Sequence, residues 1–212
     1  MMTKELNDYV REVCVEAKLA SKSISTAEHN AKDHALLAIA DKIRKSKKEI
    51  LAANEKDLKA GSGLEDALLD RLTLNPSRIE SMALGLEEVA SMPDPIGEIT
   101  NLSFRPSGIQ VGRMRVPIGV VAVIYESRPN VTADVSALCI KAGNAVILKG
   151  GSEAMYSNAS ILKCVHYGLR KHSLPQNIAQ LVKKGREVTS AFLKRGEYID
   201  VLVPRGGKGL IE

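Results

Sequence analysis

Two hydrophobic patterns divide this chain near residue 95. Up to residue 92, apolar positions recur at the spacing of one helix face, which predicts a layer of amphipathic helices over residues 1–95. Asn75-Pro76 predicts the start of one helix, and the two prolines at Pro93 and Pro95 predict its end. Ser25 and Glu28 have the spacing of a capping box and predict the start of another helix. The apolar faces of these two helices comprise Ile79, Met82, Ala83, Leu86, Val89 and Ala90, and Leu36, Ile39, Ala40 and Ile43.

A different pattern begins after Gly97. Residues 99–105 and 109–116 predict two strands joined by a Pro-Ser-Gly turn, an inserted β-hairpin. Residues 118–125 are almost wholly apolar, which is typical of a strand covered on both faces of a parallel sheet. Further strands are predicted over residues 145–149, 179–182 and 199–203, and helices over residues 131–141, 153–170 and around Val188 and Phe192. The alternation predicts an α/β fold, with a helical N-terminal layer and a Rossmann-like parallel sheet over residues 117–212.

The helix over residues 131–141 has an apolar face that is expected to pack on this sheet. Its inward residues are predicted to be Val131, Val135, Leu138 and Cys139.

The composition favours a globular protein that binds small molecules. Of 212 residues, 44% are hydrophobic, and the net charge of +5 comes from 30 basic residues interspersed with 25 acidic ones. This balance favours phosphorylated small molecules over nucleic acid as partners. A basic run on one predicted helix is interpreted as solvated surface, with a nucleic-acid patch as the alternative. The run is Lys42, Arg44, Lys45, Lys47 and Lys48.

Cysteine usage and the length of the apolar runs indicate a cytoplasmic protein. Cys14, Cys139 and Cys164 are an odd number with no close pair, which argues against a disulfide framework and for a reducing compartment. The N-terminal residues have no signal-peptide core, and no apolar run approaches the length of a membrane span. The histidines lack metal-ligand spacing, so no metal site and no membrane partner are predicted.

Polar or glycine-rich turns follow three of the predicted strands. They are ESRPN at residues 126–130, KGGSE at residues 149–153 and PRGGKG at residues 204–209. Ligands bind at the carboxyl ends of the strands in open α/β sheets, and glycines allow a ligand to approach the backbone. Ser152 is expected to cap a helix whose first amides favour anions. Neither glycine turn has the pattern of a dinucleotide fingerprint or a P-loop, so plain chain reversal is the alternative for each.

A specific resemblance adds to this interpretation. The segments are PIGVVAVIYESRPNVTADVSALCIKAGNAVILKGGSEAMYSN at residues 117–158, YIDVLVPRGGKGLI at residues 198–211 and DRLTLNP at residues 70–76. They resemble the γ-glutamyl phosphate reductases, or glutamate-5-semialdehyde dehydrogenases, of the aldehyde dehydrogenase superfamily. The resemblance implies a cytoplasmic enzyme of proline biosynthesis, in which NADPH reduces L-glutamate 5-phosphate to L-glutamate 5-semialdehyde and phosphate is released.

The resemblance also implies roles for residues in the turns. Lys149 and Ser152 are expected to meet the 2′-phosphate of NADP, and Glu153 its ribose. Asn130 resembles an asparagine whose amide stabilises an oxyanion. Arg128 is expected to bind the substrate's carboxylate or phosphate, with a structural salt bridge to the following helix as the alternative. The remaining expected cofactor contacts are Gly150 and Gly151 in the first glycine turn, and Arg205, Gly206 and Gly207 in the second.

One feature of the family is missing from these residues. The reaction needs a nucleophilic cysteine, which the resemblance places in a catalytic domain beyond residue 212. The three cysteines present are interpreted as structural. Residues 1–212 are therefore expected to be the cofactor-binding domain, inactive alone, with a truncated nucleotide-binding or partner-binding module as the alternative. The hairpin over residues 99–116 is expected to expose apolar surface and to contribute to a homo-oligomer, and glutamate 5-kinase is a candidate partner.

Overall fold

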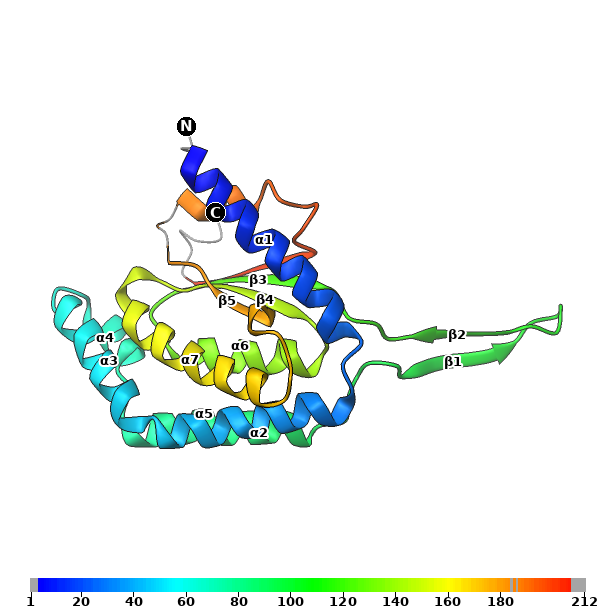
Figure 1. Ribbon diagram of the computed structural model, residues 1–212, viewed down its shortest axis with the longest axis horizontal. Coiled ribbons are helices and arrows are strands. Elements are labelled where there is room, and N and C mark those ends of the chain that lie inside the picture. The colour runs from blue at the N-terminus through cyan, green and yellow to red at the C-terminus, as the bar shows by residue number, and fades with distance from the viewer. Residues whose placement is uncertain (1–3, 184, 186, 207–212) are drawn as a thin grey trace.

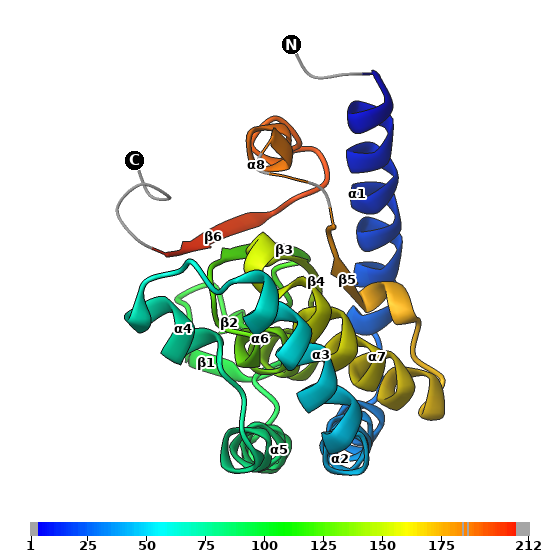
Figure 2. The same cartoon turned by 90° about the vertical axis from the view of Figure 1, so that its left-hand side faces the viewer.

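Helices cover both faces of a four-stranded parallel sheet in the computed structural model, which describes residues 4–183, 185 and 187–206 (Figure 1). Helix α1 (Lys4–Ser25) packs on one face, and helices α6 (Asn130–Lys141) and α7 (Met155–Lys171) pack on the other. Helices α2 (His29–Lys45) and α5 (Pro76–Ser91) lie side by side as an outer layer beyond α6 and α7 (Figure 2). The α/β fold predicted from the sequence is confirmed.

The sheet has the strand order β5-β4-β3-β6, with every pair parallel. Strands β3 (Val120–Tyr125) and β4 (Ala145–Lys149) are buried along their whole length, because helices cover both faces of these two central strands. The flanking strands are β5 (Ala179–Leu181) and β6 (Val201–Arg205). Since the strands are parallel, the carboxyl ends of β3, β4 and β6 lie at one edge of the sheet.

Strand β6 begins at Val201, two residues later than predicted, and the preceding residue lies at a junction of α1, β3 and β6. The carboxylate of Asp200 accepts hydrogen bonds from the backbone amide of Val120 at 2.8 Å and from the Nζ of Lys18 at 2.8 Å. Gly119 lies beside it with φ of +120°, and a Cβ there would come within 2.3 Å of the carboxylate. Asp200 therefore joins the N-terminal helix to the sheet, and only glycine fits next to it.

The N-terminal helices agree with the sequence pattern at one helix start and disagree at another. Asn75 caps α5 by accepting a hydrogen bond from the backbone amide of Arg78, and Pro76 occupies the first turn, as predicted. The predicted capping box is wrong. Ser25 is the last residue of α1 and its hydroxyl donates to the carbonyl of Lys22, while Glu28 precedes α2 without a side-chain cap. The other two helices are α3 (Lys47–Ala60) and α4 (Asp66–Leu72).

The remaining short elements complete the α/β unit. They are the 3₁₀ turns Ser152–Ala154 and Gln176–Ile178 and helix α8 (Glu187–Phe192), which lies near α1 (Figure 2). The predicted inward face of α6 is partly wrong, because Leu138 is exposed while Val131 and Cys139 are buried. Among the described residues, no helix is both long enough and apolar enough to span a bilayer.

The predicted hairpin forms an arm that projects from the body of the molecule (Figure 1). Strands β1 (Ile99–Phe104) and β2 (Gln110–Met114) pair only with each other in this arm, with Ile99 opposite Met114 and Phe104 opposite Gln110. The expected exposure of apolar surface is confirmed on both strands. The exposed apolar residues are Ile99, Leu102, Phe104, Ile109, Val111 and Met114.

Candidate functional site

Glu153 joins the turns that follow β3 and β4. Its carboxylate accepts hydrogen bonds from the backbone amide of Ser127 at 2.7 Å and from the hydroxyl of Ser127 at 2.8 Å. Burial alone would raise the pKa of Glu153, but the hydrogen bonds from its own backbone and from Ser127 lower that pKa below the ordinary value. The charged carboxylate therefore fixes the two turns relative to each other. Ser127 has φ of +35°, a backbone conformation that this connection helps to hold.

The first glycine turn is closely packed at Gly150. A Cβ at this position would lie 2.2 Å from the Nδ2 of Asn158 and 3.2 Å from the ring of Tyr125, so a larger residue would displace buried neighbours. The preceding Lys149 is also buried, and its Nζ donates to the carbonyl of Gly150 at 2.9 Å. The turn at the end of β4 thus contains a buried cation, and its backbone is packed closely against neighbouring side chains.

A buried polar network supports this turn from below. The hydroxyl groups of Tyr125 and Thr132 lie 2.7 Å apart, and the hydroxyl of Thr132 donates to the Oδ1 of Asn158 at 3.0 Å. Burial raises the pKa of Tyr125 well above its ordinary value, so its phenol stays protonated. The network links β3, α6 and α7 beneath Gly150.

The N-terminus of α7 is capped by a residue that lies about a hundred positions earlier in the chain. The carboxylate of Asp57 accepts hydrogen bonds from the backbone amides of Tyr156 at 3.0 Å and Ser157 at 2.7 Å, and from the hydroxyl of Ser157 at 2.5 Å. Asn54 also donates to that hydroxyl, at 3.0 Å. Ser152 was expected to cap this helix, but α7 begins at Met155 without a side-chain cap from Ser152. The Tyr156 and Ser157 amides are therefore bound to an internal carboxylate rather than open to a ligand anion.

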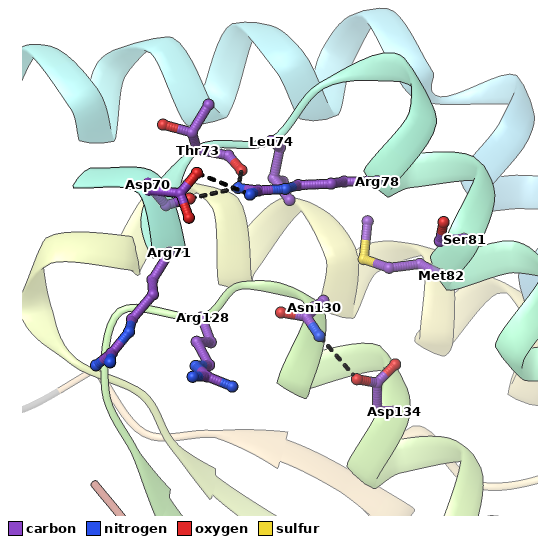
Figure 3. A pocket seen from close by; sticks show the side chains of 10 residues that line it. All are labelled: Asp70, Arg71, Thr73, Leu74, Arg78, Ser81, Met82, Arg128, Asn130 and Asp134. Atoms are coloured by element: carbon purple, nitrogen blue, oxygen red, sulfur yellow. Dashed lines mark hydrogen bonds and ion pairs between the residues drawn. The ribbon is translucent and has the colours of Figure 1, made fainter. Parts of the chain in front are cut away.

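A cavity of about 410 Å³ opens beside the β3–α6 turn, between α4, α5 and α6 (Figure 3). It contains two residues singled out in the sequence, Arg128 and Asn130, and two that sequence reasoning missed, Arg71 and Asp134. The full lining is Asp70, Arg71, Thr73, Leu74, Arg78, Ser81, Met82, Arg128, Asn130 and Asp134.

The charged residues of this cavity differ in how they are paired. Arg78 donates to the carboxylate of Asp70 at 2.9 Å and to the carbonyl of Thr73 at 2.6 Å. Arg71 and Arg128 are exposed, and neither side chain has a hydrogen bond or ion pair with another residue that the structure describes (Figure 3). Two guanidinium groups are thus free to bind an anion, and the alternative of a salt bridge from Arg128 to the following helix is not observed.

Asp134 is the acidic residue of the cavity that no arginine pairs. The Nδ2 of Asn130 donates to its Oδ2 at 2.9 Å. Burial raises the pKa of Asp134, while the hydrogen bond from Asn130 and the charge of Arg205 act in the opposite direction. The amide of Asn130, expected to stabilise an oxyanion, is therefore engaged with Asp134 in this arrangement.

The fold is shared with known proteins. The aldehyde dehydrogenase family matches residues 2–206. The chain belongs to this family. Among solved structures, it is similar to γ-glutamyl phosphate reductase from Thermotoga maritima, with 35% identity and a TM-score of 0.92 over 95% of this chain and 50% of that one. It is also similar to γ-glutamyl phosphate reductase from Saccharomyces cerevisiae, with 31% identity and a TM-score of 0.89 over 100% of this chain and 53% of that one.

The chain thus spans about half the length of these two relatives. A probable aldehyde dehydrogenase from Listeria monocytogenes shares the fold, with a TM-score of 0.75 at 16% identity. Aldehyde dehydrogenases use NAD or NADP. Of the second predicted glycine turn, Arg205 ends β6 and Gly206 follows it, both exposed, while Gly207 lies outside the described residues.

The cysteines of this aldehyde dehydrogenase chain are poorly suited to nucleophilic attack. All three are buried. Burial raises the pKa of Cys14 to about 11 and that of Cys139 to about 12, and it also raises the pKa of Cys164. Because the thiolate is the reactive form, these thiols are nearly inert at neutral pH, in agreement with the structural role assigned to them. Among residues 4–183, 185 and 187–206, no cluster of side chains could hold a metal ion.

Proposed function

We propose that this chain is the cofactor-binding part of an enzyme that reduces L-glutamate 5-phosphate to L-glutamate 5-semialdehyde and phosphate with NADPH, in proline biosynthesis. The observation that carries the proposal is the match to two γ-glutamyl phosphate reductases at 35% and 31% identity over nearly the whole chain. Matches to other aldehyde dehydrogenases have half that identity, so the likeness to the reductases exceeds what the common fold explains.

The turn at the end of β4 fits a phosphorylated dinucleotide. Gly150 and Gly151 leave room for Asn158 and for the carboxylate of Glu153, Lys149 brings a positive charge, and the Glu153 carboxylate can also accept hydrogen bonds from ribose hydroxyl groups. In the proposed enzyme these residues and Ser152 hold the adenosine end, while Arg205, Gly206 and Gly207 lie toward the pyrophosphate. The bound cofactor supplies the hydride.

The cavity beside the β3–α6 turn fits the other reactant. L-glutamate 5-phosphate is an anion at neutral pH, and Arg71 and Arg128 present two guanidinium groups without partners among the described residues. In this proposal Asn130 lies at the acyl end of the substrate, where its amide can turn from Asp134 to a developing oxyanion. The nucleophilic thiolate comes from a catalytic domain outside these 212 residues, because Cys14, Cys139 and Cys164 are buried and protonated.

Cofactor titration tests the proposal. The chain has no tryptophan, so the fluorescence of NADPH or NADH can be followed directly as the cofactor binds. We expect tighter binding of NADPH than of NADH, and a loss of about tenfold in that preference in Lys149→Ala, the size of one charge-assisted hydrogen bond. Lys48→Ala removes an exposed lysine on α3 and should leave the preference unchanged.

A second measurement separates the proposal from its alternative. The chain is mixed with a polypeptide that supplies the second half of a γ-glutamyl phosphate reductase, and phosphate-dependent reduction of NADP by the semialdehyde is followed. Turnover supports the proposed reductase. Binding of NADPH without turnover in the mixture would favour a nucleotide-binding module, and absence of binding to either cofactor would contradict the proposal.

A further inference from the structure

The cavity of about 410 Å³ holds three charged groups that form no ion pair with another described residue, although the charge of Arg205 acts on one of them, Asp134, without a direct contact. Arg71 comes from α4, Arg128 from the β3–α6 turn and Asp134 from the second turn of α6 (Figure 3). The fourth and fifth charged groups of the lining, Arg78 and Asp70, bind each other and so cancel. What remains is two positive charges and one negative charge around a single space.

The lining leaves hydrogen-bond donors and an acceptor that a ligand can use. Arg71 and Arg128 bring two like charges to one cavity, and the five donors of each guanidinium have no hydrogen-bond partner among the described residues. Asp134 is half-buried, and only one of its oxygens accepts a hydrogen bond from a described residue, that of Asn130. The other oxygen is available to a donor inside the cavity.

Three separate segments bring these charges together, which distinguishes the cavity from a solvated helix surface. On a surface helix a lone arginine or aspartate is usually hydrated and makes no site. Here the α4–α5 connection is held in place by Arg78, which donates to the carboxylate of Asp70 and the carbonyl of Thr73. Arg71 lies next to Asp70, so the same contacts fix its backbone opposite Arg128 and Asp134.

We infer that this cavity recognises an α-amino acid that has a second anionic group besides its α-carboxylate. Arg71 and Arg128 bind the two anionic groups, and the Asp134 carboxylate binds the α-ammonium. The inference rests on the proposed function, since L-glutamate 5-phosphate has an α-carboxylate, an α-ammonium and an acyl phosphate. Two cations and one anion in the cavity meet one cation and two anions in the ligand. The cavity volume also falls within the range of about 300–1,000 Å³ found for small-molecule sites.

Asp134 has the specificity-determining role in this inference. The two arginines would bind any dianion of suitable length, whereas Asp134 adds attraction only for a ligand with an ammonium group and repels an analogue that lacks it. Asn130, one helical turn before Asp134, donates to the Oδ2 and so orients the carboxylate toward the cavity. The enzyme would therefore distinguish an amino acid from the corresponding acyl phosphate without an amino group.

Stable probes of the ligand chemistry test the inference on the chain itself by titration calorimetry. L-2-Amino-5-phosphonopentanoate has the ammonium, the carboxylate and a non-hydrolysable phosphonate, and 5-phosphonopentanoate lacks only the ammonium. We expect the amino compound to bind at least about tenfold more tightly than its ammonium-free analogue, because one charged hydrogen bond is lost. Equal affinities for the two compounds, or no binding of either, would overturn the inference.

Single substitutions in the cavity test which residue makes each contact with the probes. Asp134→Asn should remove the tenfold difference between the two probes, and 5-phosphonopentanoate should bind at least as tightly as to the unsubstituted chain, because a repelling carboxylate is removed. Arg71→Met should weaken both probes by about tenfold or more, since each has two anionic groups. Arg11→Met, which removes an exposed arginine of α1 on the other face of the sheet, is the matched control and should change neither. Unchanged affinities of both probes in Asp134→Asn and Arg71→Met would contradict the inference. Circular dichroism of each variant checks that it is folded.

The cofactor titration separates this inference from the proposed function. If NADPH binds and the probes do not, or the probes bind without regard to the ammonium, the amino-acid site is wrong and the reductase assignment stands. If the probes behave as expected but neither cofactor binds, the amino-acid site stands and the reductase assignment fails.

Discussion

Replacing Asp57 with alanine should destabilise the whole chain, because its carboxylate caps α7. The carboxylate is almost fully buried and accepts three hydrogen bonds, two from backbone amides and one from the hydroxyl of Ser157. At about 1.5 kcal/mol for each hydrogen bond to a charged acceptor, the loss is between about 4 and 5 kcal/mol. That is a large part of the free energy of unfolding of a typical domain, about 5–15 kcal/mol.

Urea unfolding followed by circular dichroism measures this effect. With a slope of about 2 kcal/mol per molar urea, the midpoint of Asp57→Ala should fall by about 2 M. Asp57→Asn keeps one acceptor oxygen, and the hydroxyl of Ser157 can rotate to accept from the new amide, so about half of the loss is expected. Asp8→Ala, which removes an exposed aspartate of α1, should shift the free energy of unfolding by less than about 0.5 kcal/mol. If Asp57→Ala unfolds at the same urea concentration as Asp8→Ala, the capping role given to Asp57 is wrong.

Three further predictions concern the turns and the thiols. Gly150→Ala should lower the free energy of unfolding by about 2–4 kcal/mol, since its Cβ would displace Asn158 from a buried network. The control Gly63→Ala, which has open space around the new Cβ, should have little effect in the same urea unfolding experiment. Iodoacetamide at pH 8 should leave the folded chain unmodified, because burial raises the pKa of Cys139 to about 12 and also raises the pKa of the other two thiols. Detection of one fast-reacting cysteine by mass spectrometry would contradict this. The folded pKa of Glu153 is lowered, so its contribution to stability is present above the ordinary glutamate pKa and is lost as the pH falls through the folded value. The stability difference between the native chain and Glu153→Gln should therefore be largest near neutral pH and shrink in acid, and a difference independent of pH would refute this.

The sequence predicts those parts of the fold that depend on local pattern. The apolar run of β3, the helix start at Asn75 and the alternation of strands and helices all follow from the side-chain period or from short-range caps, and the structure has them. The capping box at Ser25 failed because α1 continues through that residue, whose hydroxyl bonds back to the preceding helical turn. Local spacing alone does not reveal where one helix ends and the next begins when tertiary packing extends the first.

The candidate site also contains residues that the sequence reveals and residues that only the folded structure reveals. Arg128 and Asn130 could be found because they follow a buried strand, where ligands are expected. Arg71 and Asp134 lie on helices, where a charged residue is usually solvated, and only the packing of three segments brings them to one cavity. Asp57 gave no signal either, because its partners lie in a helix about a hundred positions later in the chain.

The contact between Lys18 and Asp200 has a consequence for how this chain is made. The two residues are 182 positions apart, and Asp200 also binds the first amide of β3, so the N-terminal helix is fastened by a residue near the end of the described chain. At a synthesis rate of about 5–20 residues per second, α1 leaves the ribosome on the order of 10 s or more before Asp200 exists. For most of that interval the apolar face of α1, which includes Val10 and Ile24, lacks strand β4, and for all of it α1 lacks its tether to Asp200. Helix α1 is thus made well before the elements that cover its apolar face, and until they emerge that face is exposed to other apolar surfaces.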